Sequence, residues 1–531
     1  MAPPTQICHM NNGDSLNGVA IRVVTKETAA PPAHSASLLD TDEFRRHGHQ
    51  VIDFIADYYA GMGSYPVRPS VTPGFLRDKL PAEAPRRPDN GFAAALRDVR
   101  DHILPGLTHW QSPRHFAHFP ASSSTAGALG EALAAGINVV PFTWTASPAA
   151  TELEMVVMDW LGKALHLPES LLFPGGGGGT LLGTSCEAIL CVLVAARERK
   201  LAEIGSRRIG DLVVYCSDQT HFALRKAARI AGIHRDNCRE IPTCRDHMFA
   251  LSPADLRTAM DADVDAGLVP LFLCATIGTT QTAAVDPVRE LCDVAAAHGA
   301  WTHIDAAYAG SALVCPEFRH VMDGAEAVDS FSMNAHKWLL ANTDCCALWV
   351  RRPALLVAGL GTEQEYILKD SAEDGHDVVD YKDWSVTLTR RFRALKLWLV
   401  LRCYGVEGLR DHVRAHVRMA AEFERMVSSD ERFEVVVTRQ FSLVCFRLRS
   451  PEKLGGEKAA NEINRRLLQE VNVTSSGPYM SSAKVGGIYM LRCAIGSTLT
   501  EERHVTEAWK VVQDRGAELL RKMEISSSVL A

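Results

Sequence analysis

Apolar and polar positions follow two different periods along the middle of the chain, residues 108–405. Short apolar runs of strand length alternate with segments such as residues 288–298, where apolar residues recur every three or four positions and predict a helix. Strands that alternate with helices form mostly parallel sheets covered on both faces, so we expect a large α/β domain here. The predicted strands are residues 212–216, 269–275, 301–304, 330–333 and 346–350.

The two ends of the chain show different patterns. Residues 1–37 contain Pro, Ala, Asn and Ser without periodicity, which predicts a mobile tail. Residues 38–107 begin with a helical pattern from Asp40 and are expected to form a helical N-terminal arm. Residues 406–531 predict a smaller α+β domain. Its expected strands are residues 433–437, 442–449 and 487–495, and its expected helices are residues 410–427, 457–470 and 500–522.

Composition excludes several classes of protein. The 531 residues are 47% hydrophobic and carry a formal net charge of −7, which gives no electrostatic basis for binding nucleic acid or an anionic membrane. The charge-free windows at residues 132–151 and 266–285 contain Pro and Thr and predict buried core, not membrane spans. The 14 cysteines include no Cys-x-x-Cys pair and the N-terminus has no secretory pattern. We therefore expect a cytoplasmic protein without a metal site. The alternative is a transit peptide in residues 1–37, which contain Ala and Ser and few acids, although Arg22 and Lys26 give it little support.

Two residues at the ends of predicted strands suggest a bound cofactor. Lys337 follows the apolar strand at residues 330–333 and precedes Trp338; a partly buried lysine has a lowered pKa and can bond covalently to an aldehyde cofactor. Asp305 directly follows the strand at residues 301–304, at the sheet edge where open α/β sheets bind ligands. Its carboxylate needs a cationic partner such as a protonated pyridine nitrogen, or else it caps a helix.

Polar turns are expected at the same edge of the sheet. The glycine run at residues 175–179 leads through small hydroxyl residues into the apolar helix at residues 188–196, and backbone N–H groups at a helix N-terminus suit a phosphate. A glycine run alone is more often a flexible turn. Two further turns, residues 217–221 and 278–280, end predicted strands. Together these turns predict one ligand site.

These motifs resemble the group II pyridoxal-phosphate-dependent decarboxylases, and among them the plant aromatic L-amino-acid decarboxylases. The resemblance extends from about Leu39 to Lys522. It implies the aspartate-aminotransferase-type (fold type I) α/β fold, pyridoxal 5'-phosphate as cofactor, and a homodimer with the active site at the subunit interface. The motifs that carry it are Asn334 with His336-Lys337-Trp338, and residues 303–311, 147–152, 315–320 and 390–393.

The resemblance also implies roles for single residues. Lys337 is expected to bind the cofactor covalently, Asp305 to pair with the pyridine nitrogen, and His221 to stack on the ring and orient the substrate carboxylate. The further cofactor contacts are expected from Ser185, Cys186, Asn334 and Thr280. The substrate pocket is expected to contain Pro120, His118, Phe119, Phe142, His336 and Thr389.

Two positions predict the substrate and the product. Thr389 stands where relatives that prefer tryptophan have Gly and relatives that prefer tyrosine have Ser, so we expect tyrosine or dopa. Tyr366, in a polar segment with the character of a lid, stands where decarboxylases have Tyr and aldehyde synthases have Phe, so we expect an amine product. The alternatives are an aromatic acetaldehyde synthase and an inactive cofactor-binding subunit. Ala335, His118 and Pro141 replace the family's usual Pro, Tyr and Gly.

Overall fold

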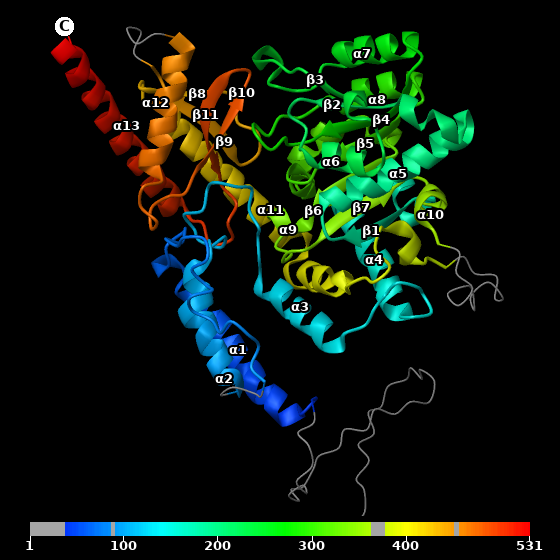
Figure 1. Cartoon of the computed structure of the whole chain (residues 1–531), viewed down its shortest axis with the longest axis horizontal. Coiled ribbons are helices and arrows are strands. Elements are labelled where there is room, and N and C mark those ends of the chain that lie inside the picture. Colours follow the sequence, from blue (N-terminus) through cyan, green and yellow to red (C-terminus); the bar gives the residue numbers. More distant parts are fainter. Residues whose placement is uncertain (1–37, 87–90, 363–377, 451–455, 531) are drawn as a thin grey trace, which may run out of the picture. The chain divides into compact units, whose positions relative to one another are not determined.

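The computed structural model describes residues 38–86, 91–362, 378–450 and 456–530 (Figure 1). The predicted tail and Tyr366 lie outside these residues. The described residues fall into two units that meet between Asp57 and Tyr58, inside helix α1 (Thr41–Ala60). The arm predicted over residues 38–107 is therefore divided between the two units, and the predicted domain boundaries stay predictions.

The second unit contains a seven-stranded sheet (Figure 1). Its strands are β1 (Gly178–Leu182), β2 (Leu212–Ser217), β3 (Cys238–Ile241), β4 (Val269–Thr276), β5 (Trp301–Asp305), β6 (Ser330–Asn334) and β7 (Cys346–Val350). They are ordered β1-β7-β6-β5-β4-β2-β3, and β7 alone runs antiparallel to its two neighbours. This mostly parallel arrangement confirms the predicted α/β class.

Helices cover both faces of this sheet, as the alternating pattern predicts. They include α4 (Pro148–Ala164), α5 (Ser185–Ile204), α6 (Ala223–Ile230), α7 (Pro253–Asp265), α8 (Val288–Ala297) and α10 (Ala354–Leu360). Successive strand residues point to opposite faces. Val214 and Cys216 of β2 accordingly pack with residues of α5 and α6, whereas Val213 and Tyr215 pack with residues of α7 and α8. Because both faces are buried, these strands are apolar without alternation.

The strands β1 and β3 were not predicted. Gly178 and Gly179 lie inside β1, and both are fully buried. A Cβ atom added to Gly179 would lie 2.4 Å from the Met158 methyl group on α4 and 2.9 Å from the Trp349 ring, so a larger residue would displace these side chains. In β3, three of the four residues are only partly buried or exposed, and the strand pairs with β2 alone. Both departures hide the apolar signal of a strand.

A four-stranded antiparallel sheet forms near the C-terminus, where the α+β prediction had three strands and missed the strand at residues 481–485. Its order is β10-β11-β9-β8, with β8 (Phe433–Val435), β9 (Leu443–Leu448), β10 (Ser481–Val485) and β11 (Ile488–Ala494). The helices here are α11 (Arg393–Ser428), α12 (Gly456–Val471) and α13 (Glu502–Leu530). The boundary predicted after residue 405 falls inside α11, at Gly405, whose φ of 63° and ψ of 173° interrupt the helix.

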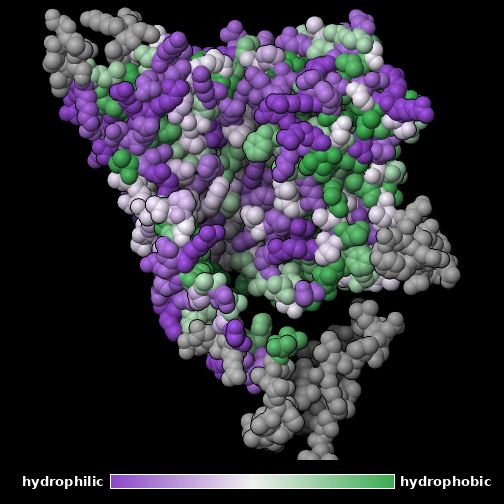
Figure 2. Space-filling view, viewed as in Figure 1, coloured by the Kyte–Doolittle hydropathy of each residue, from purple (hydrophilic) through white to green (hydrophobic). Residues whose placement is uncertain are grey.

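The remaining helices are α2 (Gly91–Asp98), α3 (Thr125–Ile137) and α9 (Ala335–Trp338). None of the helices in the described residues is both long and apolar enough to cross a membrane. Hydrophilic residues cover much of the face shown in Figure 2, and apolar residues occur on it in smaller groups.

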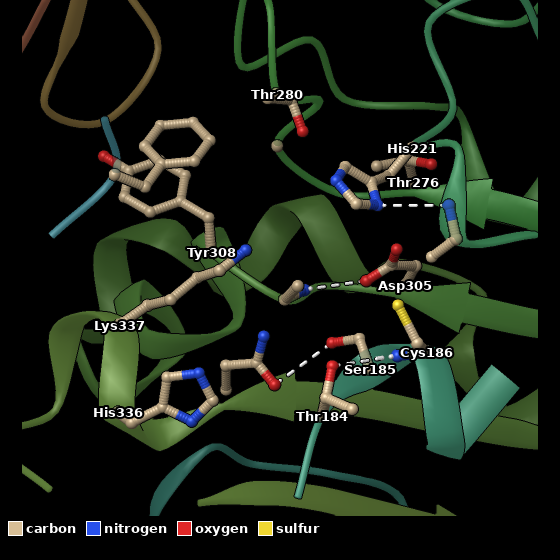
Figure 3. A pocket seen from close by; sticks show the side chains of 15 residues that line it. Thr184, Ser185, Cys186, His221, Thr276, Thr280, Asp305, Tyr308, His336 and Lys337 are labelled. Carbon is tan, nitrogen blue, oxygen red and sulfur yellow. Dashed lines mark hydrogen bonds between the residues drawn. The ribbon is translucent and has the colours of Figure 1, made fainter. Parts of the chain in front are cut away.

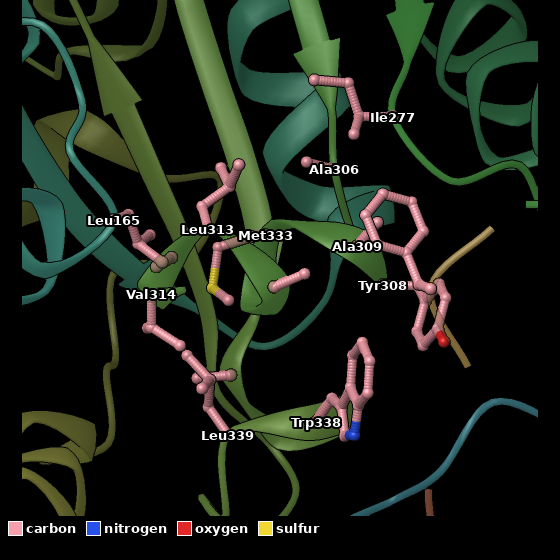
Figure 4. Packing of buried hydrophobic residues seen from close by; sticks show 14 of the residues in the cluster. Leu165, Ile277, Ala306, Tyr308, Ala309, Leu313, Val314, Met333, Trp338 and Leu339 are labelled. Carbon is pink, nitrogen blue, oxygen red and sulfur yellow. The ribbon is translucent and has the colours of Figure 1, made fainter. Parts of the chain in front are cut away.

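A continuous aromatic stack fixes the short helix α9 in the core (Figure 4). The Tyr308 ring stacks on Phe119 with centroids 3.7 Å apart and on Trp338 with centroids 5.1 Å apart. The Trp338 indole N–H donates to His416 Nδ1 at 2.9 Å, and the Tyr308 hydroxyl bonds the Ser442 hydroxyl at 2.7 Å. Trp338, the residue beside Lys337, is thereby held by Tyr308 on its ring face and by His416 at its indole N–H.

Candidate active site

Lys337 lies on α9, directly after β6, and its amine faces a cavity of about 230 Å³ (Figure 3). The backbone around it is fixed, because the Lys337 carbonyl accepts from the Ser122 N–H at 3.1 Å. Burial lowers the pKa of the Lys337 amine, while the nearby Asp305 carboxylate acts in the opposite direction. A lowered pKa leaves more of the amine unprotonated and nucleophilic, as the sequence predicted.

Asp305 is the last residue of β5 and lies in the same cavity, with 3% of its surface exposed. Its Oδ1 accepts from the Ala307 N–H at 3.0 Å, and no ion pair involves it within the described residues. The carboxylate thus bonds a local turn and does not cap an α-helix. A nearly buried carboxylate without a cationic partner has a free position for a protonated ring nitrogen.

The start of α5 offers an anion site at the same cavity. Thr184 is the N-cap residue, with an extended backbone, and its hydroxyl accepts from the Cys186 N–H at 3.2 Å. The Ser185 hydroxyl donates to Asn334 Oδ1 at 3.0 Å, which joins α5 to the end of β6. Thr184, Ser185, Cys186 and Asn334 all line the cavity. The N-terminus of a 20-residue helix favours a phosphate here.

His221 follows β2 and lines the cavity opposite α9 (Figure 3). Its Nδ1 accepts from the Ala223 N–H at 3.2 Å, so the neutral ring carries its proton on Nε2. Burial lowers the pKa of His221; Asp305 acts against this and Lys337 adds to it. Thr280, in the turn that follows β4, lines the same cavity. The structure therefore brings together all six residues expected to contact the cofactor besides Lys337.

A second cavity of about 640 Å³ adjoins the first, since Phe119, His221, Thr280, His336 and Lys337 line both. It extends to Trp110, His118, Pro120 and Arg492. Four of the six predicted substrate residues, Pro120, His118, Phe119 and His336, are thus in place. Its size fits an amino-acid side chain with an aromatic ring.

Phe142 and Thr389 are not among the residues that line either cavity. They lie in neighbouring segments elsewhere: the Phe142 carbonyl accepts from the Lys382 N–H at 2.8 Å, and Arg390 donates to the Pro141 carbonyl at 3.2 Å. The prediction that both residues belong to the substrate pocket stays a prediction, because neither lines a cavity of its own chain.

The sequence reasoning missed Trp110 and Arg492, and it covered Thr184 only as one of the small hydroxyl residues that lead into α5. Arg492 is 5% exposed and donates to four neutral oxygens, among them the carbonyls of Thr280 at 2.6 Å and of Ala117 at 3.2 Å. It therefore connects the turn that carries Thr280 with the segment that carries Phe119. The signal was present: a single arginine in the apolar strand predicted at residues 487–495.

Comparison with known proteins agrees with this site. The model of the pyridoxal-dependent decarboxylase conserved domain matches residues 73–449. The chain is 77% identical to a tyrosine decarboxylase of Oryza sativa subsp. japonica, over 98% of this chain and 100% of that protein.

Solved structures of plant enzymes are also similar to this chain. The structure of Oryza sativa TDC with PLP and tryptamine has a TM-score of 0.89 and 47% identity, over 91% of this chain and 100% of the other. The Rhodiola rosea 4-hydroxyphenylacetaldehyde synthase has a TM-score of 0.85 and 49% identity, over 91% and 99%. These matches confirm the predicted aspartate-aminotransferase-type fold. The chain therefore belongs to the pyridoxal-dependent decarboxylase family.

Proposed function

We propose that this protein decarboxylates an aromatic L-amino acid, tyrosine or dopa in preference to tryptophan, to the arylalkylamine and carbon dioxide. The observation that carries the proposal is the meeting of Lys337, Asp305, His221 and the α5 N-terminus around one cavity. The high identity to the rice tyrosine decarboxylase supports the substrate class. The presence of all these groups argues against an inactive cofactor-binding subunit.

The residues present fit pyridoxal 5'-phosphate. Lys337 supplies an amine for the aldehyde, the unpaired Asp305 carboxylate a partner for the pyridine nitrogen, and Thr184, Ser185 and Cys186 a helix N-terminus for the phosphate. When bound, the cofactor would supply a conjugated ring that draws in the electron pair left on the α-carbon when the substrate carboxylate leaves as carbon dioxide.

The chain's own groups perform the remaining work. Asp305 keeps the proton on the pyridine nitrogen, because its charge stabilises the protonated form. His221 can donate from Nε2 to the substrate carboxylate, since its Nδ1 is occupied by the Ala223 N–H. The stacked rings of Phe119 and Tyr308 form an apolar wall that limits water in the cavity. In our proposal, Tyr366 donates a proton to the α-carbon, and the Lys337 amine would then replace the product nitrogen on the cofactor's aldehyde carbon, which frees the amine.

The second candidate function is an aromatic acetaldehyde synthase, which the similarity to the Rhodiola rosea enzyme favours. The two functions differ in whether the α-carbon is protonated or oxidised. Tyr366 supports the amine, because a phenol with a pKa near 10 can donate the proton that phenylalanine lacks.

The active unit in this proposal is a homodimer whose partner copy contributes to the active site. On α3, Leu129, Leu133 and Ile137 are 50%, 50% and 55% exposed and, at spacings of four, lie on one helix face. An apolar stripe of this kind is favourable only when a partner covers it. A partner copy would also explain why Phe142 and Thr389 lie away from the cavity of their own chain. All described cysteines are free, which suits the cytoplasm.

The test is a substrate panel with the purified protein loaded with pyridoxal phosphate. Tyrosine, dopa, tryptophan and phenylalanine are compared by kcat/KM, with amine and hydrogen peroxide measured together. We expect amine from tyrosine or dopa with little peroxide. A higher kcat/KM for tryptophan would overturn the substrate preference, and stoichiometric peroxide would establish the synthase instead.

A second test addresses the dimer. Leu133→Glu places a charge in the α3 stripe and should shift the protein from dimer to monomer in light scattering, with loss of activity. The exposed Val264, on α7, gives a matched control in Val264→Glu, which should remain a dimer. A wild-type monomer with full activity would contradict the dimer proposal.

A further inference from the structure

Three aromatic side chains, Trp110, His118 and Tyr479, form a cluster at the larger cavity, and no chemical role has been given to them above. The rings of Trp110 and His118, which both line the cavity, stack with centroids 5.3 Å apart and planes inclined by 26°. The His118 ring also meets the edge of Tyr479, with centroids 6.0 Å apart. Because Lys337 lines this cavity too, the ring of a substrate whose amino group reacts near Lys337 can extend toward His118.

The backbone around His118 is rigid. The Phe116 N–H donates to the Tyr479 carbonyl at 2.8 Å, which connects the segment before His118 to the segment that contains Tyr479. The Ala117 carbonyl accepts from the buried Arg492 guanidinium at 3.2 Å. With its neighbours fixed and its ring stacked on Trp110, the His118 imidazole is held in place before substrate binds, which is what precise recognition requires.

The imidazole has polar atoms to offer. Within the described part of the chain, neither ring nitrogen of His118 has a hydrogen-bond partner, and the residue is exposed where it lines the cavity. Partial burial and the charge of Arg492 lower the pKa of His118. The ring is therefore neutral near pH 7, with one nitrogen that donates and one that accepts.

We propose that His118 hydrogen-bonds the ring hydroxyl of the substrate and so selects phenolic amino acids over phenylalanine. This inference rests on the proposed function and specifies its substrate class. A hydroxyl can both donate to and accept from a neutral imidazole. Phenylalanine has no such group, so its ring displaces water from the imidazole without replacing the hydrogen bond. Sites that bond a substrate hydroxyl discriminate against analogues that lack it.

The test compares L-tyrosine with L-phenylalanine in three forms of the loaded enzyme. His118→Phe keeps a ring on Trp110 but removes both nitrogens, and should lower the tyrosine-to-phenylalanine ratio of kcat/KM about tenfold, or about 1.4 kcal/mol. His118→Gln keeps a donor and an acceptor and should retain most of the ratio. Tyr479→Phe removes a hydroxyl from the same cluster, but Tyr479 does not line the cavity, so its ratio should equal that of the wild type.

A binding measurement separates this inference from the proposed function. Calorimetry with 3-(4-hydroxyphenyl)propionate and 3-phenylpropionate measures binding without turnover. The ratio of the two dissociation constants should favour the hydroxylated compound about tenfold more in the wild type than in His118→Phe. A ratio in His118→Phe within twofold of the wild type, in kinetics or in binding, would overturn the role of His118. A wild type that converts neither amino acid but shows the binding preference would contradict the proposed function and leave His118 supported.

Discussion

Replacement of Asp305 by asparagine removes one charge from the centre of the site and little else. Asparagine has nearly the same shape, and its Oδ1 can still accept from the Ala307 N–H, the hydrogen bond that holds the aspartate at 3.0 Å. The described residues provide no other acidic group that lines the smaller cavity. The pyridine nitrogen of the cofactor would therefore lose the negative charge that keeps it protonated.

The size of the effect follows from the burial of Asp305, which is 3% exposed. Two unit charges about 4 Å apart interact by roughly 4 kcal/mol at an effective dielectric constant of about 20. At about 1.4 kcal/mol for each factor of ten, kcat should fall by about a thousandfold. The absorbance spectrum of the bound cofactor should change as well, because its ring nitrogen is no longer protonated.

The assay is steady-state decarboxylation with saturating tyrosine and cofactor, so that weaker binding of either does not enter kcat. Asp261→Asn is a matched control, since Asp261 pairs with His298 at the surface, away from both cavities. It should keep wild-type kcat. A kcat of Asp305→Asn within about tenfold of the wild type would refute the role assigned to this carboxylate.

Three further predictions concern the product, the pocket and the stability. Tyr366→Phe should divert turnover from amine to aldehyde and peroxide while carbon dioxide release continues; unchanged amine yield would contradict the proton-donor role. Arg492→Met, which leaves the carbonyls of Thr280 and Ala117 without their donor, should raise KM at least tenfold, and wild-type KM would contradict its role in shaping the pocket. Burial lowers the pKa of His303 to about 3 and the pKa values of His336 and His416 to about 4. Unfolding therefore takes up protons, and the free energy of unfolding should fall from about pH 6.5 to pH 4, by up to 1.4 kcal/mol per pH unit for each histidine. Burial raises the pKa of Asp286 to about 6, which acts in the opposite direction, but this is one group against three histidines. A free energy of unfolding that rises on acidification would therefore contradict the assignment.

The sheet strands next to the site could be predicted because they are buried on both faces. β5, β6 and β7 begin where their apolar runs begin, and β5 and β6 end one residue beyond the predicted strands, at Asp305 and Asn334. These polar residues end their strands at the edge where parallel sheets bind ligands, which made Asp305 recognisable. In contrast, β1 contains Gly178 and Gly179 and gave no apolar signal.

The substrate pocket could be predicted only in part. His118 and Phe119 lie next to each other in the chain, and the structure places both at the cavity with Lys337. Whether Phe142 or Thr389 reaches a given cavity depends on how distant segments and subunits pack, which no local pattern records. Arg492 stands out as a lone arginine in an apolar strand, but its partners, three backbone carbonyls and the Ser481 hydroxyl, could not be read from the sequence.

The most direct measurement is the identification of the residue that binds the cofactor. Borohydride reduction of the loaded enzyme makes the bond between lysine and cofactor permanent, and peptide mass spectrometry then finds the modified residue. We expect the added mass on Lys337, at the cavity that also contains Asp305 and His221. In Lys337→Ala, neither the modified peptide nor amine formation from tyrosine should remain. Modification of a different lysine, or full turnover by Lys337→Ala, would contradict the assignment of this cavity as the active site.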